Sequence, residues 1–159
     1  MIRPFFISAF LGLILTACGS PTTEQQLSGT WIQDIPTSTT QNGTQVTTLS
    51  TVLEFEKDGD VQLRRQIELS GNNLPAEGVG LDIDLSGTWR LEDGVLIQRV
   101  EDAWVTPRQT SEIAQSYANQ LQDQASQSST TQKTILVLTR EELILQDLET
   151  GLTDSYRRK

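Results

Sequence analysis

The sequence LSGTW stands at residues 27–31 and recurs unchanged at residues 85–89. Alternating apolar and polar residues accompany both copies, so each copy is expected to begin a β-strand. The glycine permits a bulge or a close backbone approach, and the tryptophan carries a large apolar area toward a core. The repeat therefore predicts two similar strand starts within a mainly β protein, and it does not require a duplicated domain.

The clearest alternation lies just after the first copy of the motif. Leu53 and Phe55 fall on one face of a strand over residues 44–56, with glutamates on the other face. The dipeptide Asp58-Gly59 predicts a hairpin turn into a half-buried strand over residues 61–69, which Arg65 interrupts on its apolar face. Similar patterns predict strands at residues 27–35, 81–85, 95–101, 134–139, 143–148 and 152–158, and loops at 36–43 and 71–80.

One segment has helical rather than β periodicity. Residues 106–109 resemble a capping box with proline at the first helical position. Ile113, Tyr117, Leu121 and Ala125 then recur every fourth residue. This spacing predicts an amphipathic helix over residues 107–126, with one apolar stripe that covers the sheet or, alternatively, binds a partner.

The amino terminus has the pattern of an export signal. Arg3 precedes an apolar run over residues 5–15, which is shorter than the approximately 20 residues of a membrane-spanning helix. Leu15-Thr16-Ala17-Cys18 then matches the lipobox of bacterial lipoproteins. The alternatives are a buried helix or an ordinary secreted protein, but the charge, the length of the run and the cysteine agree on a lipoprotein.

The lipobox resemblance implies the processing of Cys18. Its thiol would be alkylated with diacylglycerol, the chain cut between Ala17 and Cys18, and the new amine acylated with a fatty acid such as palmitate. Cys18 is the only cysteine, so lipidation accounts for a lone thiol that no intramolecular disulfide could use. The next residue is Gly19 rather than an aspartate, which favours the outer membrane, with the domain at its periplasmic face.

Charge and composition narrow the classes of function. The formal net charge is −9 and there is no histidine. Acidity disfavours nucleic acid as a partner, and the missing histidine removes the commonest general base and metal ligand, so neither a metal nor another cofactor is expected. A carboxylate enzyme is conceivable through Asp82 and Asp84, but such alternating acids are more often the solvated face of a strand. We therefore expect no enzyme.

The strand pattern resembles the lipocalin-like domains of bacterial lipoproteins. The resemblance rests on residues 29–31, Phe55 with the following Asp-Gly turn, residues 87–89, and the segments 143–148 and 150–157. It implies a signal peptide at 1–17, a lipidated cysteine with a flexible tether at 18–26, and an antiparallel barrel or strongly curved sheet of about eight to nine strands at 27–159. The chain departs from the family in lacking disulfides and in placing its helix before the last three strands.

The same resemblance supplies a barrel-end pair and two alternatives for function. Trp31 is expected to lie beneath a basic residue from late in the chain, Arg157 or Arg158, with Arg157 favoured. As a binding module, the barrel would hold a small apolar ligand against Arg65 and Trp104. Alternatively, Arg65 pairs with a carboxylate, Trp104 belongs to the core, and a side-chain-filled barrel presents its helix and loops to an envelope protein partner.

Overall fold

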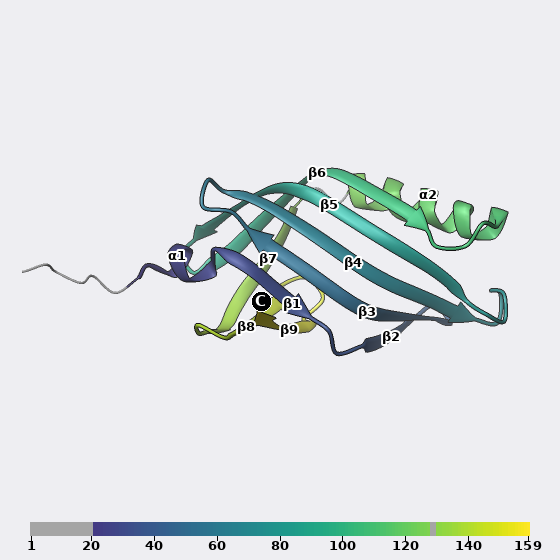
Figure 1. Cartoon of the computed structure of the whole chain (residues 1–159), viewed down its shortest axis with the longest axis horizontal. Coiled ribbons are helices and arrows are strands. Elements are labelled where there is room, and N and C mark those ends of the chain that lie inside the picture. Colours follow the sequence, from purple (N-terminus) through teal and green to yellow (C-terminus); the bar gives the residue numbers. More distant parts are fainter. Residues whose placement is uncertain (1–20, 128–129) are drawn as a thin grey trace, which may run out of the picture.

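An antiparallel sheet of nine strands forms the body of the protein (Figure 1). The computed structural model describes residues 21–127 and 130–159, so the predicted signal peptide and the lipidation of Cys18 lie outside the described residues. The elements are α1 (Thr23–Leu27), β1 (Gly29–Gln33), β2 (Thr37–Gln41), β3 (Thr44–Phe55), β4 (Asp60–Gly71), β5 (Val79–Glu92), β6 (Val95–Pro107), α2 (Glu112–Gln127), β7 (Thr130–Leu138), β8 (Glu142–Asp147) and β9 (Thr153–Arg158).

The sheet closes because β1 pairs on both sides. Its residues Gly29–Gln33 lie antiparallel to the end of β3, and Trp31 and Ile32 pair with β9. Strands β1 and β3–β9 therefore form an eight-stranded barrel, to which β2 adds an extra strand at β3. This confirms the predicted lipocalin-like barrel and the position of a helix before the last three strands.

The strands of the barrel differ in length, so only one part of the long strands lies within the closed ring. Strands β3–β6 contain 12 to 14 residues, whereas β1 and β7–β9 contain 5 to 9. The strand β7 pairs with only the first part of β6, up to Arg99, so the far half of β6 continues beyond the closed ring. There α2 packs on β6 and β5, as Figure 1 shows.

Two apolar clusters fill the two parts of the interior. The first lies in the closed ring and includes Trp31, Phe55 and Trp89, with the rings of Phe55 and Trp89 in edge contact at 5.3 Å. The second lies under α2 and includes Ile67, Leu81 and other side chains of the extended strands. Because both clusters lie on the same face of β4, the polar residues between them occupy the middle of the interior.

Two segments differ from the sequence prediction at the start of the domain. Residues 23–27 form α1 rather than a flexible tether or the start of a strand, because Thr22 and Gln25 make a reciprocal capping box and Leu27 is completely buried. The predicted loop at 36–43 instead contains β2. Asn42 and Gly43, both with positive φ, form a tight turn that returns the chain into β3.

The helix begins later than predicted, and its most buried residues lie beside the predicted stripe, of which Tyr117 and Leu121 do pack against the cluster under the helix. Pro107 is the last residue of β6, and the side chain of Ser111 accepts a hydrogen bond from the Ala114 amide at the true start of α2. Ala114 and Ala118 are fully buried, whereas Ile113 is 46% exposed. Small residues thus let the helix approach the sheet closely. Neither helix among the described residues is long and apolar enough to cross a membrane.

Candidate functional site

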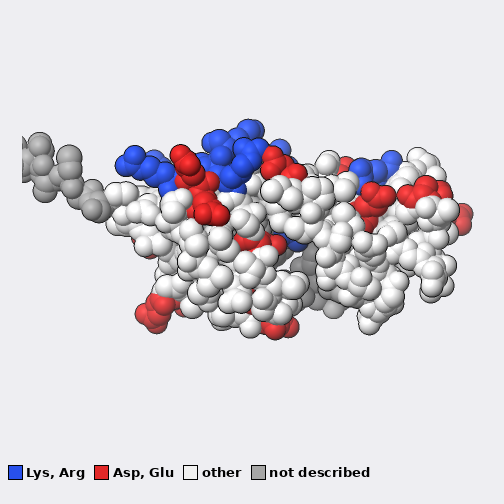
Figure 2. All heavy atoms as spheres, turned by 90° about the horizontal axis from the view of Figure 1, so that it is seen from below, with Lys and Arg blue, Asp and Glu red and all other residues white. Residues whose placement is uncertain are grey.

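Closure of the barrel gathers charged side chains around an internal cavity of about 270 Å³. Its apolar wall comes from β4 and β5, with Val61, Leu63 and Leu85. Its charged side joins one residue of β4 and one of β6 to three residues from the last strands. These charged residues are Arg65, Arg99, Lys133, Asp147 and Asp154. In Figure 2 the middle of the visible face is hollowed, and basic and acidic atoms are seen at depth there.

Arg65 is a half-buried cation with spare hydrogen-bond donors. Its position between Leu63 and Ile67 on the inner face follows from strand alternation. Its Nε donates to Oγ1 of the fully buried Thr51 at 3.2 Å. Within the described residues Arg65 makes no ion pair, so the expected carboxylate partner is not found there. The prediction that Arg65 lines a cavity agrees with its position.

Lys133 is the most deeply placed cation of the cavity. Its side chain is only 12% exposed, and its Nζ lies 3.6 Å from Oδ2 of Asp154. Burial lowers the pKa of Lys133, Asp154 opposes that shift, and the nearby charge of Arg65 lowers the pKa further. A single loose ion pair thus offsets only part of the cost of burying this charge.

Asp147 contributes its charge but few free acceptor sites. Its Oδ1 accepts hydrogen bonds from the amides of Glu149 and Thr150 and from the Thr150 hydroxyl, at 2.8 to 3.0 Å. These bonds, that of the Thr150 amide first, lower the pKa of Asp147 against the opposing effect of its burial. The carboxylate therefore holds the turn between β8 and β9, and it remains ionised beside the cavity.

Tyr156 lies on the same face of β9 as Asp154, but it does not line the cavity. The side chain is 2% exposed, and its OH makes no hydrogen bond within the described residues. Burial raises the pKa of Tyr156, the charge of Asp154 raises it further, and Arg65 opposes both, so the hydroxyl lies near these two charges. A buried, unsatisfied hydroxyl is costly to the fold.

The predicted barrel-end pair exists, but with a different arginine. The guanidinium carbon of Arg158 lies 4.1 Å from the ring centroid of Trp31. Arg158 also donates to the carbonyl oxygens of Gln26, Ser28 and Arg140. It therefore closes the end of the barrel where α1 lies.

The favoured candidate, Arg157, is on the opposite face of β9. It points outward and pairs with Asp34, with Nη2 2.5 Å from Oδ2. Successive residues of a strand alternate between faces, so only one of the two arginines can reach Trp31, and the prediction of Arg157 was wrong. Their mutual contact lowers the pKa of Asp34 and raises that of Arg157.

Trp104, the second predicted ligand-lining residue, does not reach the cavity. It pairs with Asp84 on the outer face of the sheet and is 64% exposed. The prediction failed because a bulge between β5 and β6 inserts one residue into β6 between Gln98 and Trp104. The two residues are six apart in the sequence, but the bulge puts their side chains on opposite faces of the sheet. Lys133, Asp154 and Tyr156 were missed because each looks like an ordinary polar residue of a short strand.

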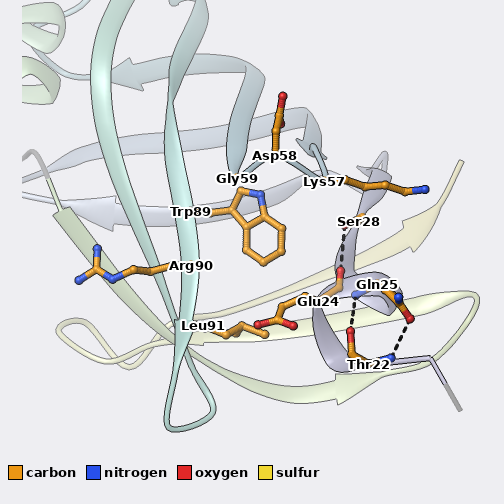
Figure 3. Close-up of a pocket in the computed structure, with 10 residues that line it drawn as sticks. All are labelled: Thr22, Glu24, Gln25, Ser28, Lys57, Asp58, Gly59, Trp89, Arg90 and Leu91. Carbon is orange, nitrogen blue, oxygen red and sulfur yellow. Dashed lines mark hydrogen bonds between the residues drawn. The ribbon is translucent and has the colours of Figure 1, made fainter. Parts of the chain in front are cut away.

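A second hollow lies outside the barrel, beside α1 (Figure 3). Trp89 and Leu91 line it, and charged side chains including Glu24, Lys57 and Arg90 surround it. Its polar residues are occupied locally: Thr22 and Gln25 bond each other, and Ser28 bonds the Glu24 carbonyl oxygen. This open groove therefore lacks the converging, partly buried charges that distinguish the internal cavity.

The fold and the internal cavity define a lipocalin-like β-barrel with a charged interior. In the described part of the chain no cluster of acidic side chains is suited to a metal ion, and Asp82 lies toward Arg108 on the outer face. On the surface in Figure 2, basic side chains gather along one edge with acidic ones among them. No protein-family model matches the chain, and no curated protein matches its sequence.

Proposed function

We propose that this protein is a lipid-anchored envelope lipoprotein whose barrel binds a small molecule in its internal cavity. The lipobox, with cleavage before Cys18, supports the anchor, and Gly19 supports the outer membrane, with the domain at its periplasmic face. The observation that carries the binding function is the convergence of three cations and two carboxylates around a cavity inside an apolar barrel. Such groups are expensive to bury without a ligand.

Binding fits the architecture better than a purely structural role does. Large side chains fill the ring near α1, as an interaction lipoprotein with a filled barrel would require. The middle of the interior, however, leaves about 270 Å³ between an apolar wall and a polar one. A pocket with a mostly apolar lining and a few placed polar groups is the usual form of a small-molecule site.

The anchor is tested by replacing the only cysteine. Cys18→Ser should abolish incorporation of labelled palmitate and move the protein out of the membrane fraction, with Thr16→Ser as a control that preserves a small residue in the lipobox. A Cys18→Ser protein that still carries lipid would contradict the proposal.

The binding function is tested separately from the anchor. Full-length protein, purified in non-ionic detergent, should release a stoichiometric small molecule when extracted with organic solvent and examined by mass spectrometry. The matched control is a Leu63→Trp variant, whose side chain should fill the cavity and leave the extract empty. An empty extract from both proteins would favour the filled barrel and direct attention to protein partners.

A further inference from the structure

The free hydrogen-bonding groups of the cavity are mainly donors. Arg65 lines the cavity and uses only its Nε within the described residues. Gln98 points inward with 9% exposure, and its side-chain amide has no hydrogen bond among the described residues. Oδ1 of Asp147 is engaged in a turn, and Asp154 faces Lys133. Within the described residues neither carboxylate forms an ion pair with Arg65.

We infer that the cavity binds a short organic carboxylate, whose carboxylate group lies on Arg65; this inference rests on the proposed binding function. A planar guanidinium donates two parallel hydrogen bonds to a carboxylate. The ligand charge would neutralise a cation that has no ion-pair partner in the described chain. Lys133 is less suited to the role because Asp154 already faces it.

The size and lining of the cavity set the rest of the ligand. Val61, Leu63, Leu85 and Val100 provide an apolar wall for a hydrocarbon body. The volume of about 270 Å³ corresponds to about nine water molecules at ~30 Å³ each. This space is large enough for a short aliphatic or aromatic acid and too small to enclose a long acyl chain.

The test compares each acid with its neutral amide. Calorimetry on the full-length protein in non-ionic detergent would use acetate, butyrate, hexanoate, benzoate and palmitate, with the matching amides. We expect short acids to bind at least tenfold more tightly than their amides. Arg65→Gln should weaken binding of the acids by about 10- to 100-fold and leave the amides unchanged. The matched control is Arg64→Gln, on the exposed outer face of the same strand.

The outcomes distinguish the ligand class from the function itself. If neither acids nor amides bind and solvent extraction releases nothing, both the proposed function and this inference fail. If the amides bind as tightly as the acids, or Arg65→Gln changes nothing, the cavity binds ligands but the carboxylate assignment is wrong. Preferential binding of palmitate would overturn the limit on ligand length.

Discussion

At the residue scale, Gly29 leaves the space in which Arg158 packs at the end of the barrel. A Cβ added there would lie 2.7 Å from Nη1 of Arg158, and the residue has φ of +125°. Gly29→Ala should therefore strain the backbone and displace the arginine from Trp31, lowering the free energy of unfolding by about 2 kcal/mol or more. Gly94→Ala is the control, because its φ is +80° with no atom within 4 Å. If urea unfolding shows that Gly29→Ala and Gly94→Ala lose the same free energy of unfolding, the contact with Arg158 does not contribute.

Tyr156 should control the stability of the protein in alkali. An unfolded tyrosine ionises near pH 10.0, whereas burial raises the pKa of Tyr156 in the folded chain. Above that pH the unfolded state loses its proton first, so the free energy of unfolding falls as pH rises, by up to about 1.4 kcal/mol per pH unit. Lys133, with its lowered pKa, acts in the opposite sense below 10.5.

The two contributions are separated by a single substitution. In urea unfolding at several alkaline pH values, Tyr156→Phe should lose less stability above pH 10.0 than the unmodified protein does. Tyr117→Phe is the matched control on α2. If both variants follow the unmodified protein, the phenol of Tyr156 is not protected by burial.

At the element scale, the two faces of α2 can be told apart by substitution. Ala118 is fully buried against the sheet, so Ala118→Leu should overpack the contact and cost about 1–3 kcal/mol. Ile113 was expected in the apolar stripe but is 46% exposed, so Ile113→Ala should cost less than about 1 kcal/mol. Thermal unfolding would measure both changes. A larger loss of stability in Ile113→Ala than in Ala118→Leu would mean that Ile113 belongs to the packed face of α2, as the sequence predicted.

The accuracy of the sequence prediction also varies between elements. The turns at Gly59 and Gly94 were predicted because Asp-Gly pairs between alternating segments favour positive φ, which both glycines adopt. The hairpin into β2 was missed although Asn42-Gly43 carries the same signal, since the threonine-rich segment before it has no apolar face. Helix α2 was placed in the correct region, but the start was wrong because proline can also end a strand.

At the scale of the whole molecule, the cavity could not be read from local patterns. Arg65 was conspicuous because it interrupts an apolar face, but its neighbours Lys133 and Asp154 are far along the chain. They approach Arg65 only when β1 joins β3 to β9 and closes the ring. The pairing of β1 with both strands depends on how the whole sheet curves and closes. The residue pattern of a single strand does not determine it.

The closed ring also predicts an orientation for the anchored protein. The strand registers place the turn at Gly94 at the same end of the barrel as α1 and the Trp31–Arg158 pair, and Ala76 at the other end of the long strands. Figure 1 shows α1 at one end of these strands. A strand of 12 residues spans about 40 Å. If Cys18 is lipidated, the few residues before Thr22 reach at most about 14 Å, so the α1 end must stay close to the bilayer.

A fluorophore at each end would measure this orientation. The protein would be lipidated at Cys18 and labelled through an unnatural amino acid in place of Gly94 or of Ala76, then reconstituted into vesicles with a quencher on the lipid headgroups. Quenching should be strong at position 94 and weak at position 76, because quenching decays over a distance much shorter than the barrel. Equal quenching would mean that the barrel lies flat on the membrane. Under the proposed anchor, strong quenching at position 94 alone places the far half of the barrel, with α2, away from the bilayer.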